Sequence, residues 1–403
     1  MSRTPGSERV AEPLDGYRVV DLTTMISGPL ATMILGDQGA DVIKVEPPGA
    51  GDLVRRLGDT RRGMAATFAT SNRNKRSVVL NLKHPDGREI LERLVQTADI
   101  FVQNFRPGTA DRMGLGEDTL RRIKRDLVYV SINGFGESGP YAHKRVYDPV
   151  IQALSSLASI QGGRGSERPR MVRLIVPDKL TAVTAAQAMT AALLARERTG
   201  RGQHVRLSML DAMIAFLWPE GMSGHTFIGD EARVPRTALA QDLVFETADG
   251  YITTGAVSDA EWQGLARATE HPEWLEDARF ATPAGRLAHM KERLDLMADA
   301  LRARASAEWL ERLDAEGVPC APILTRGEML THPQVAANDL IVESVHPHAG
   351  PMRQTRPAAR FDVTPATIRR PAPMLGEHTD EVLAELGLSR DEITARREAT
   401  AIA

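Results

Sequence analysis

The stretch SVVLNLKHPDGREILERLVQTADIFVQN, Ser77 to Asn104, is the clearest indication of the fold class. It opens and closes with short apolar runs, Ser77–Leu82 and Asp99–Asn104, whose composition is typical of buried strands. Between them Pro85 suits the first turn of a helix. Apolar residues then recur at helical spacing, at Ile90, Leu91, Leu94 and Val95. Strand, helix and strand in this order predict a parallel βαβ unit.

The same alternation continues on both sides of this unit. A long helical stretch runs from Asp178 to about Arg198, and a shorter one includes Leu30–Gln38. Further strand-like runs lie at Tyr17–Leu22, Ala40–Glu46, Leu127–Ile132 and His204–Met209. Strands that alternate with helices predict a parallel, doubly wound α/β domain.

The pattern changes at about His225, where a second domain is expected. Leu243–Val257 reads as a hairpin around Asp249-Gly250, and helices that carry tryptophans follow it. This predicts a smaller α+β domain over 225–330, after a large domain over 1–224. Residues 331–403 form a C-terminal segment that contains a Pro-rich stretch and a final helix.

Composition excludes several classes of partner. The net charge of −3 gives no reason to expect nucleic acid or an anionic membrane as a partner, and the 4% of aromatic residues are too few for a base-stacking surface. No run of about 18 apolar residues predicts a membrane span, and the N-terminus lacks the apolar core of a signal peptide. A single cysteine, Cys320, is typical of a reduced protein, so a cytoplasmic location is expected.

Common cofactor motifs are missing. Gly134–Gly139 matches the glycine pattern of a dinucleotide site, but Pro140 follows at once where a helix should open, so no NAD is expected. No phosphate-binding loop for ATP occurs. The histidines are scattered, and His346 and His348 sit in a Pro/Gly-rich stretch where solvent exposure is expected, so no metal site is predicted.

Basic residues cluster over Asn72–Ser77, and Lys83, Arg106 and Arg112 follow. Two interpretations remain open. The cluster is either a run of solvent-exposed surface residues or part of a binding site for a phosphate-bearing ligand. Such a site would lie at the strand ends of the sheet, where α/β folds bind ligands.

Two aspartates frame the middle of the chain. Asp178 follows Pro177 at the start of the long helix, and Asp148 precedes Pro149. Aspartate is a preferred N-cap, so each could serve only to cap a helix. A carboxylate pair beside a binding cleft would equally suit acyl exchange or proton transfer.

Taken together, these segments resemble the family III CoA-transferases, the group of the carnitine and formyl-CoA transferases, almost from end to end. The resemblance is carried by DLTTMISGPLATMILGDQGADVIKVEPPGAGD, NRNKRSVVLNLKHPDGREIL, ADIFVQNFRPGTADRMGLG, GFGESGPYAHKRVYDPVIQA, ERTGRGQHVRLSMLDA and LGEHTDEVLAELGL.

The resemblance implies a large Rossmann-like domain built from both chain ends, a smaller inserted domain and an interlocked homodimer. It also implies coenzyme A as part of the substrate and Asp178 as the catalytic aspartate. Pro47 stands where the family has an arginine beside the adenine, and the glycine-quartet loop of formyl-CoA transferases has no counterpart. The positions that match the CoA-binding residues are Met25, Ile26, Ser27, Leu80, Lys83, Asn104, Phe105, Arg112, Arg145 and Met209.

The expected reaction moves CoA from an acyl-CoA donor to a carboxylic acid through an aspartyl anhydride and an aspartyl-CoA thioester, without ATP. The alternative within the same fold is an α-methylacyl-CoA racemase, whose acid/base pair is this aspartate and a histidine at the position of Tyr147. Tyrosine ordinarily titrates near pH ~10 and is a poor base at neutral pH, which favours the transferase. Tyr147 and Asp148 are then supporting residues. A non-catalytic acyl-CoA-binding protein is a third, weaker alternative.

Overall fold

The computed structural model describes residues 11–162, 168–229 and 242–403. The chain divides into two compact units, Met1–Pro219 with Asp339–Ala403, and Glu220–Asn338. The domain breaks expected from the sequence, after residues 224 and 330, differ from these limits by five and eight residues.

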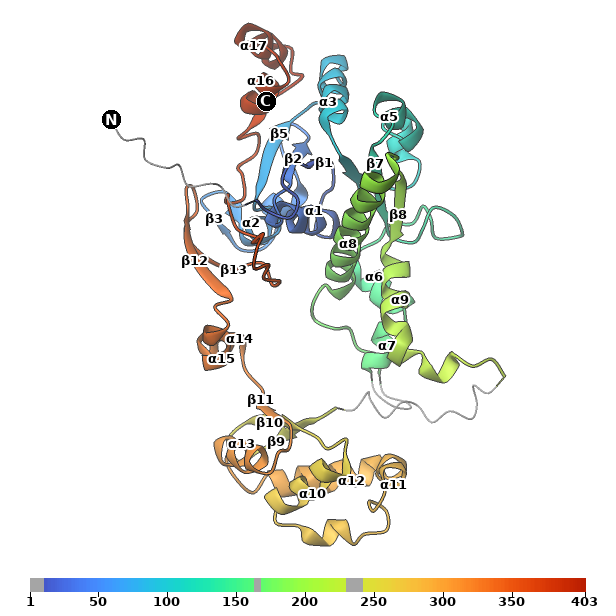
Figure 1. The fold of residues 1–403 in the computed structure, drawn as a ribbon, viewed down its shortest axis with the longest axis vertical. Helices are drawn as coiled ribbons and strands as arrows, with labels where there is room; N and C mark the ends of the chain where they lie inside the picture. Colours follow the sequence, from blue (N-terminus) through green and yellow to red (C-terminus); the bar gives the residue numbers. More distant parts are fainter. Residues whose placement is uncertain (1–10, 163–167, 230–241) are drawn as a thin grey trace. The chain divides into compact units, whose positions relative to one another are not determined.

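The first unit is built on a parallel sheet of six strands (Figure 1). In spatial order these are β5 (Lys75–Val79), β2 (Asp41–Glu46), β1 (Arg18–Asp21), β6 (Ile100–Gln103), β7 (Val128–Asn133) and β8 (His204–Ser208). Each neighbouring pair is parallel. The predicted parallel α/β sheet is therefore confirmed, and the chain reverses its direction of winding at β1.

Helices cover both faces of this sheet because alternate strand residues point to opposite sides. Val19 and Val42 pack with α1 (Ser27–Asp37) and α8 (Val176–Thr199), while Val20 and Ile43 pack with the helices of the other face. Those helices are α3 (Pro85–Thr97), α5 (Glu117–Ile123), α16 (Thr379–Glu385) and α17 (Arg390–Glu398). The central strands β1, β6 and β7 are almost fully buried and mostly apolar, as parallel strands covered on both faces usually are.

The C-terminal residues belong to the same core. Val382 and Ile393 pack beside α3 and α5, and Ile402 forms an isolated bridge with Leu80. A hairpin that the sequence does not predict, β12 (Ile341–His346) with β13 (Gly350–Thr355), precedes them. The expectation that His346 is solvent-exposed is wrong, because its ring is buried, with Nε2 2.9 Å from the carbonyl of Ala372.

The second unit has an antiparallel sheet of β9 (Val244–Glu246), β10 (Tyr251–Thr254) and β11 (Cys320–Pro322), in the order β11-β10-β9. The predicted hairpin around Asp249-Gly250 is confirmed. Trp262, Trp274 and Trp309 form the core of the unit. They pack among α10 (Asp259–Ala268), α11 (Pro283–Ala288), α12 (Met290–Leu301), α13 (Ser306–Ala315) and the short η3 (Pro272–Leu275), and α14 (Arg326–Thr331) and α15 (Pro333–Ala337) follow.

Shorter elements complete the first unit. They are η1 (Leu53–Arg56), β3 (Thr60–Arg61), β4 (Met64–Ala65), α2 (Ala66–Ser71), α4 (Thr109–Arg112), α6 (Asp148–Leu154), α7 (Leu157–Gln161) and α9 (Met209–Gly221), and η2 (Ser223–His225) follows in the second unit. In the part of the chain that the structure describes, no helix combines the length and the apolar character needed to cross a membrane.

The basic run Asn72–Ser77 fits neither interpretation offered for it, because all six residues are buried. Arg73 pairs with Asp37 at 2.7 Å and Lys75 with Asp21 at 3.0 Å. Arg76 binds Asp41, Glu381 and Glu385. These cations are used inside the protein, where they join β5 and the residues just before it to β1, β2, α1 and α16.

Candidate active site

The loops that leave β1 and β6 meet at the carboxyl edge of the sheet, where the winding reverses. Asn104 follows β6, and Thr24 follows β1. The Asn104 side chain forms two hydrogen bonds with the backbone of Thr24. Its Oδ1 accepts from the Thr24 N–H at 2.9 Å, and its Nδ2 donates to the Thr24 carbonyl at 2.8 Å. Open α/β sheets bind their ligands at this switch point.

Most residues expected to bind CoA follow the carboxyl ends of strands, so the fold brings them to one edge of the sheet. Lys83, Arg112 and Arg145 are exposed, so their cationic groups are accessible to phosphates. Leu80 lies in the core, and Ile26, Ser27 and Met209 are also buried. The others are Met25, Ile26 and Ser27 after β1, Asn104 and Phe105 after β6, and Met209 after β8.

Asp178 lies in the first turn of α8 but is not its N-cap. The helix begins at Val176 with Ile175 as N-cap, so the expectation that Asp178 caps it is wrong. The carboxylate of Asp178 accepts hydrogen bonds from the backbone N–H and the hydroxyl of Ser27, the first residue of α1. Two helix N-termini therefore converge on this carboxylate, and both favour negative charge there.

Asp148 is a second carboxylate at the same place. It is the first residue of α6, with Tyr147 as the N-cap, and is only 2% exposed. Its Oδ2 accepts from the backbone N–H of Asp178 at 3.2 Å, and its Oδ1 accepts from Gln152 Nε2 at 2.6 Å. Asp148 thus satisfies an amide at the start of α8 and does not cap its own helix.

Both carboxyl groups, Asp178 and Asp148, have a pKa above the ordinary value for aspartate. Burial, and next the charge of Asp148, raise the pKa of Asp178 to about 6, although the Ser27 hydrogen bonds oppose this shift. Burial also raises the pKa of Asp148, while its bonds with Gln152 and Asp178 and the charge of Lys179 oppose that shift. At pH 7 Asp178 is still mainly ionised, and it is more basic than an ordinary aspartate.

Tyr147 does not share this environment. Its side chain is 63% exposed, whereas the adjacent Asp148 is buried. The extended backbone of Tyr147 turns consecutive side chains to opposite sides. A catalytic acid or base must lie within hydrogen-bond reach of the reacting atom, and a supporting role for Tyr147 stays a prediction.

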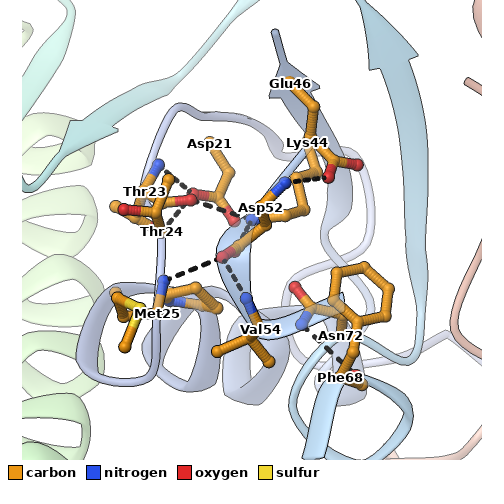
Figure 2. Close-up of polar contacts among 12 residues, drawn as sticks. Asp21, Thr23, Thr24, Met25, Lys44, Glu46, Asp52, Val54, Phe68 and Asn72 are labelled. Carbon is orange, nitrogen blue, oxygen red and sulfur yellow. Dashed lines mark hydrogen bonds and ion pairs between the residues drawn. The ribbon is translucent and has the colours of Figure 1, made fainter. Parts of the chain in front are cut away.

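A group of buried charges beneath the loop after β1 is not predicted by the sequence reasoning (Figure 2). Lys44 of β2 and Lys75 of β5 are fully buried, and they face Asp52 and Asp21 respectively, each at 3.0 Å. The available signal was a lysine within DVIKVE, a strand otherwise typical of a buried parallel sheet. Lysine is almost never buried unless it is paired.

Other ligand sites find less support. Among residues 11–162, 168–229 and 242–403, no three His, Cys, Asp or Glu side chains group as a metal site would require. After the Gly134–Gly139 loop the next helix begins only at Asp148, so the loop does not open a helix as a dinucleotide site does.

Comparisons with known proteins identify the family of this chain. Residues 14–379 match CoA-transferase family III. The chain belongs to CoA-transferase family III. It is thus an enzyme, a CoA-transferase, whose class of reaction moves CoA between an acyl-CoA and an acid.

Individual relatives support the same assignment. Human succinyl-CoA:glutarate CoA-transferase is 34% identical over 380 residues, 93% of this chain and 86% of that protein. The formyl-CoA:oxalate CoA-transferase of Streptomyces coelicolor is 35% identical, over 95% of this chain and 97% of its own. The crystal structure of Rv3272 from Mycobacterium tuberculosis superposes with a TM-score of 0.81 at 32% identity, covering 92% of this chain and 99% of that chain.

Proposed function

We propose that this family III CoA-transferase moves CoA from an acyl-CoA donor to a carboxylic acid acceptor with Asp178 as the nucleophile. The observation that carries the proposal is the enclosure of Asp178. Its carboxylate lies at the start of a helix, beside a second carboxylate and under two hydrogen-bond donors of Ser27.

In the first half-reaction an Asp178 oxygen attacks the thioester carbonyl of the donor. The C–S bond breaks, which gives a mixed anhydride and free CoA thiolate. The thiolate then attacks the carbonyl carbon of Asp178 and expels the donor's acid as a carboxylate. The enzyme now holds CoA as an aspartyl thioester.

The second half-reaction repeats these steps in reverse order. The acceptor carboxylate attacks the aspartyl thioester, which releases CoA thiolate and forms a new anhydride. The thiolate attacks the acceptor's carbonyl, and Asp178 leaves as the free carboxylate. One thioester replaces another, so the exchange is close to thermoneutral and requires no ATP.

The surroundings of Asp178 suit each step. Its raised pKa makes the ionised oxygen a stronger nucleophile, because nucleophilicity rises with basicity within one class of group. The Ser27 N–H and hydroxyl, aimed at this carboxyl, can stabilise negative charge that develops on its oxygens.

CoA binding is proposed for the carboxyl edge of the sheet. Lys83, Arg112 and Arg145 would hold the phosphates, since each is exposed and cationic groups form strong hydrogen bonds with phosphates. Met25, Ile26, Ser27, Asn104, Phe105 and Met209 would line the rest of the path, while Leu80 would support it from the core.

A homodimer is also proposed, supported by apolar side chains on three neighbouring helices. Helices α6, α8 and α9 pack around Ile151, Met209 and Met213. The same helices expose large apolar side chains, and exposed apolar surface often marks a site of protein–protein interaction. These are Val150 and Leu154 on α6, Val183 and Leu194 on α8, and Phe216 and Trp218 on α9.

Chemical trapping tests the proposed nucleophile. The enzyme would be incubated with an acyl-CoA such as succinyl-CoA and then treated with borohydride or hydroxylamine. Asp178 should be converted to the alcohol or the hydroxamate, and the change should be located by mass spectrometry of the peptide that contains it. Modification that is absent, or that falls on another residue, would refute the role of Asp178.

A further inference from the structure

The segment Thr23–Ser27 links β1 to α1. Hydrogen bonds from surrounding side chains hold the backbone of its first three residues. The Thr23 N–H donates to Asp21 at 2.8 Å, and the Thr23 carbonyl accepts from Lys44 Nζ at 2.8 Å. The Asn104 side chain accepts from the Thr24 N–H and donates to the Thr24 carbonyl. The Met25 N–H donates to Asp52 Oδ1 at 3.1 Å (Figure 2).

The side chains that hold the segment are themselves buried and paired. Lys44 Nζ lies 3.0 Å from Asp52 Oδ2, and both side chains are fully buried. Asp52 Oδ1 also accepts from the Val54 N–H at 3.1 Å, and the Asp52 N–H donates to Glu46 at 3.0 Å. Burying two charges costs so much solvation that a buried ion pair is weak evidence for stability. In some proteins such a pair instead specifies one conformation.

The conformation specified here is an unusual one. Met25 has a φ of 70°, in the left-handed region that residues with a Cβ rarely adopt. Such strain persists only where the surroundings over-determine it, and it gathers at functional sites. The hydrogen bond from Met25 N–H to Asp52 is a direct restraint on this residue.

Two residues beyond Met25, Ser27 begins α1 and donates from its N–H and its hydroxyl to Asp178. We propose that the buried Lys44–Asp52 pair is a positioning device for the active site. It holds Met25 in its strained conformation and so keeps the two Ser27 donors aligned with the carboxylate of Asp178. The inference rests on the proposed role of Asp178 and adds Lys44 and Asp52 as positioning residues.

A purely structural role predicts a different result from a positioning role. If the pair only stabilised the fold, its removal would lower the melting temperature and leave the titration of Asp178 unchanged. If it positions Ser27, its removal weakens hydrogen bonds that lower the pKa of Asp178, and this pKa rises. The other groups that bear on this titration are Asp148 and, through Asp148, Lys179.

The test compares Asp52→Asn, Ser27→Ala and the double variant in the full-length enzyme, with kcat measured against pH. Each single variant should lower kcat about tenfold to a hundredfold and move the acid limb to higher pH. The double variant should do no more than the worse single variant, because both changes act on the same hydrogen bonds.

Asp37→Asn serves as the matched control. It breaks another buried ion pair, Asp37 with Arg73, at the far end of the same helix α1. It should cost stability while leaving the acid limb where the wild type has it.

A second variant covers the case in which Asp52→Asn does not fold. Lys44→Met combined with Asp52→Leu leaves no buried charge unpaired, and such replacements often keep or raise stability. In this variant too, the acid limb of the kcat profile should lie at higher pH than in the wild type.

The positioning role would be overturned if the acid limb of kcat in these variants lay at the same pH as in the wild type. It would also be overturned if the losses of kcat in the two single variants added fully in the double variant. If Asp178 is trapped as proposed and these shifts are absent, only this inference fails. If Asp178 is not trapped, the proposed function fails first.

Discussion

The carboxylate of Asp148 accepts a hydrogen bond from the backbone N–H of Asp178, with 3.2 Å between Oδ2 and N. This contact joins the starts of α6 and α8 and places two carboxylates in one partly buried site. The negative charge of Asp148 therefore opposes ionisation of Asp178, in addition to the effect of burial. The relationship links the local fold to the acidity of the proposed nucleophile.

The pH dependence of turnover should report this acidity. Because only ionised Asp178 can attack, kcat should fall on the acid side with an apparent pKa of about 6. Asp148→Asn removes the opposing charge, so the acid limb should move to lower pH. Rate profiles for both proteins from pH 4.5 to 8 check this, and an unshifted limb in Asp148→Asn would contradict the coupling.

Asp178→Asn should separate activity from stability. The amide cannot form the anhydride, so CoA exchange should fall by several orders of magnitude. The pKa of Asp178 is raised from 3.8 to about 6, so its ionised form destabilises the folded state, a cost that grows as pH rises between those values. Partial solvent access reduces the full linkage value, so Asp178→Asn should be more stable by about 1–2 kcal/mol at pH 8.

Denaturant unfolding at two pH values checks the sign of that effect. At pH 8 Asp178→Asn should have the larger free energy of unfolding, and at pH 4 the difference should vanish because the folded wild type is then protonated. A variant that is active, or less stable at pH 8 than at pH 4 relative to wild type, would be inconsistent with the proposed site.

Arg112→Ala should raise the KM for the acyl-CoA donor about tenfold, because one charge-assisted phosphate contact is lost. The chain offers a matched control in Arg122→Ala. Both arginines are exposed and donate from Nη2 to a threonine hydroxyl three residues earlier. Steady-state kinetics at fixed ionic strength should show the change in KM for Arg112→Ala alone, and equal values for both variants would remove Arg112 from the CoA site.

Exchange of the α-proton distinguishes transfer from racemisation. The exposed position of Tyr147 leaves it poorly placed as a partner base to Asp178. A 2-methylacyl-CoA incubated with the enzyme in deuterated water should therefore gain no deuterium at the α carbon, as read by mass spectrometry. Enzyme-dependent incorporation would establish the racemase alternative.

The proposed dimer should persist on dilution. If the two chains interlock, they cannot separate without unfolding, so sedimentation or mass photometry at nanomolar concentration should detect only dimers. Phe216→Asp, which puts charge on an exposed apolar face, should lower the yield of dimer. A wild-type monomer in rapid equilibrium with the dimer would refute interlocking.

Several expectations from the sequence depended on local patterns and were accurate for that reason. Strands β1, β2, β6 and β7 are largely apolar runs, and the hairpin at Asp249-Gly250 is specified by its own turn residues. The βαβ unit from Ser77 onward places its helix at Pro85–Thr97, where the apolar spacing predicts it. Such patterns are set by neighbours in the chain and need no distant contact.

Expectations that depended on distant partners were less accurate. The basic run Asn72–Ser77 is buried because acidic residues from β1, β2, α1 and α16 reach it. His346 is buried because its ring nitrogen meets the carbonyl of Ala372. A charged or polar residue looks the same in the sequence whether water or a remote side chain solvates it.

Local sequence patterns predict the parallel α/β sheet and the place of Asp178 at the start of a long helix. The groups that surround that carboxylate come from distant parts of the chain, and only the packing of helices on the sheet brings them together. Ser27 comes from the start of α1 and Asp148 from the start of α6, and the acidity of Asp178 depends on both. A pKa is set by burial and by charges within a few ångströms, and those neighbours are fixed by how helices pack on the sheet.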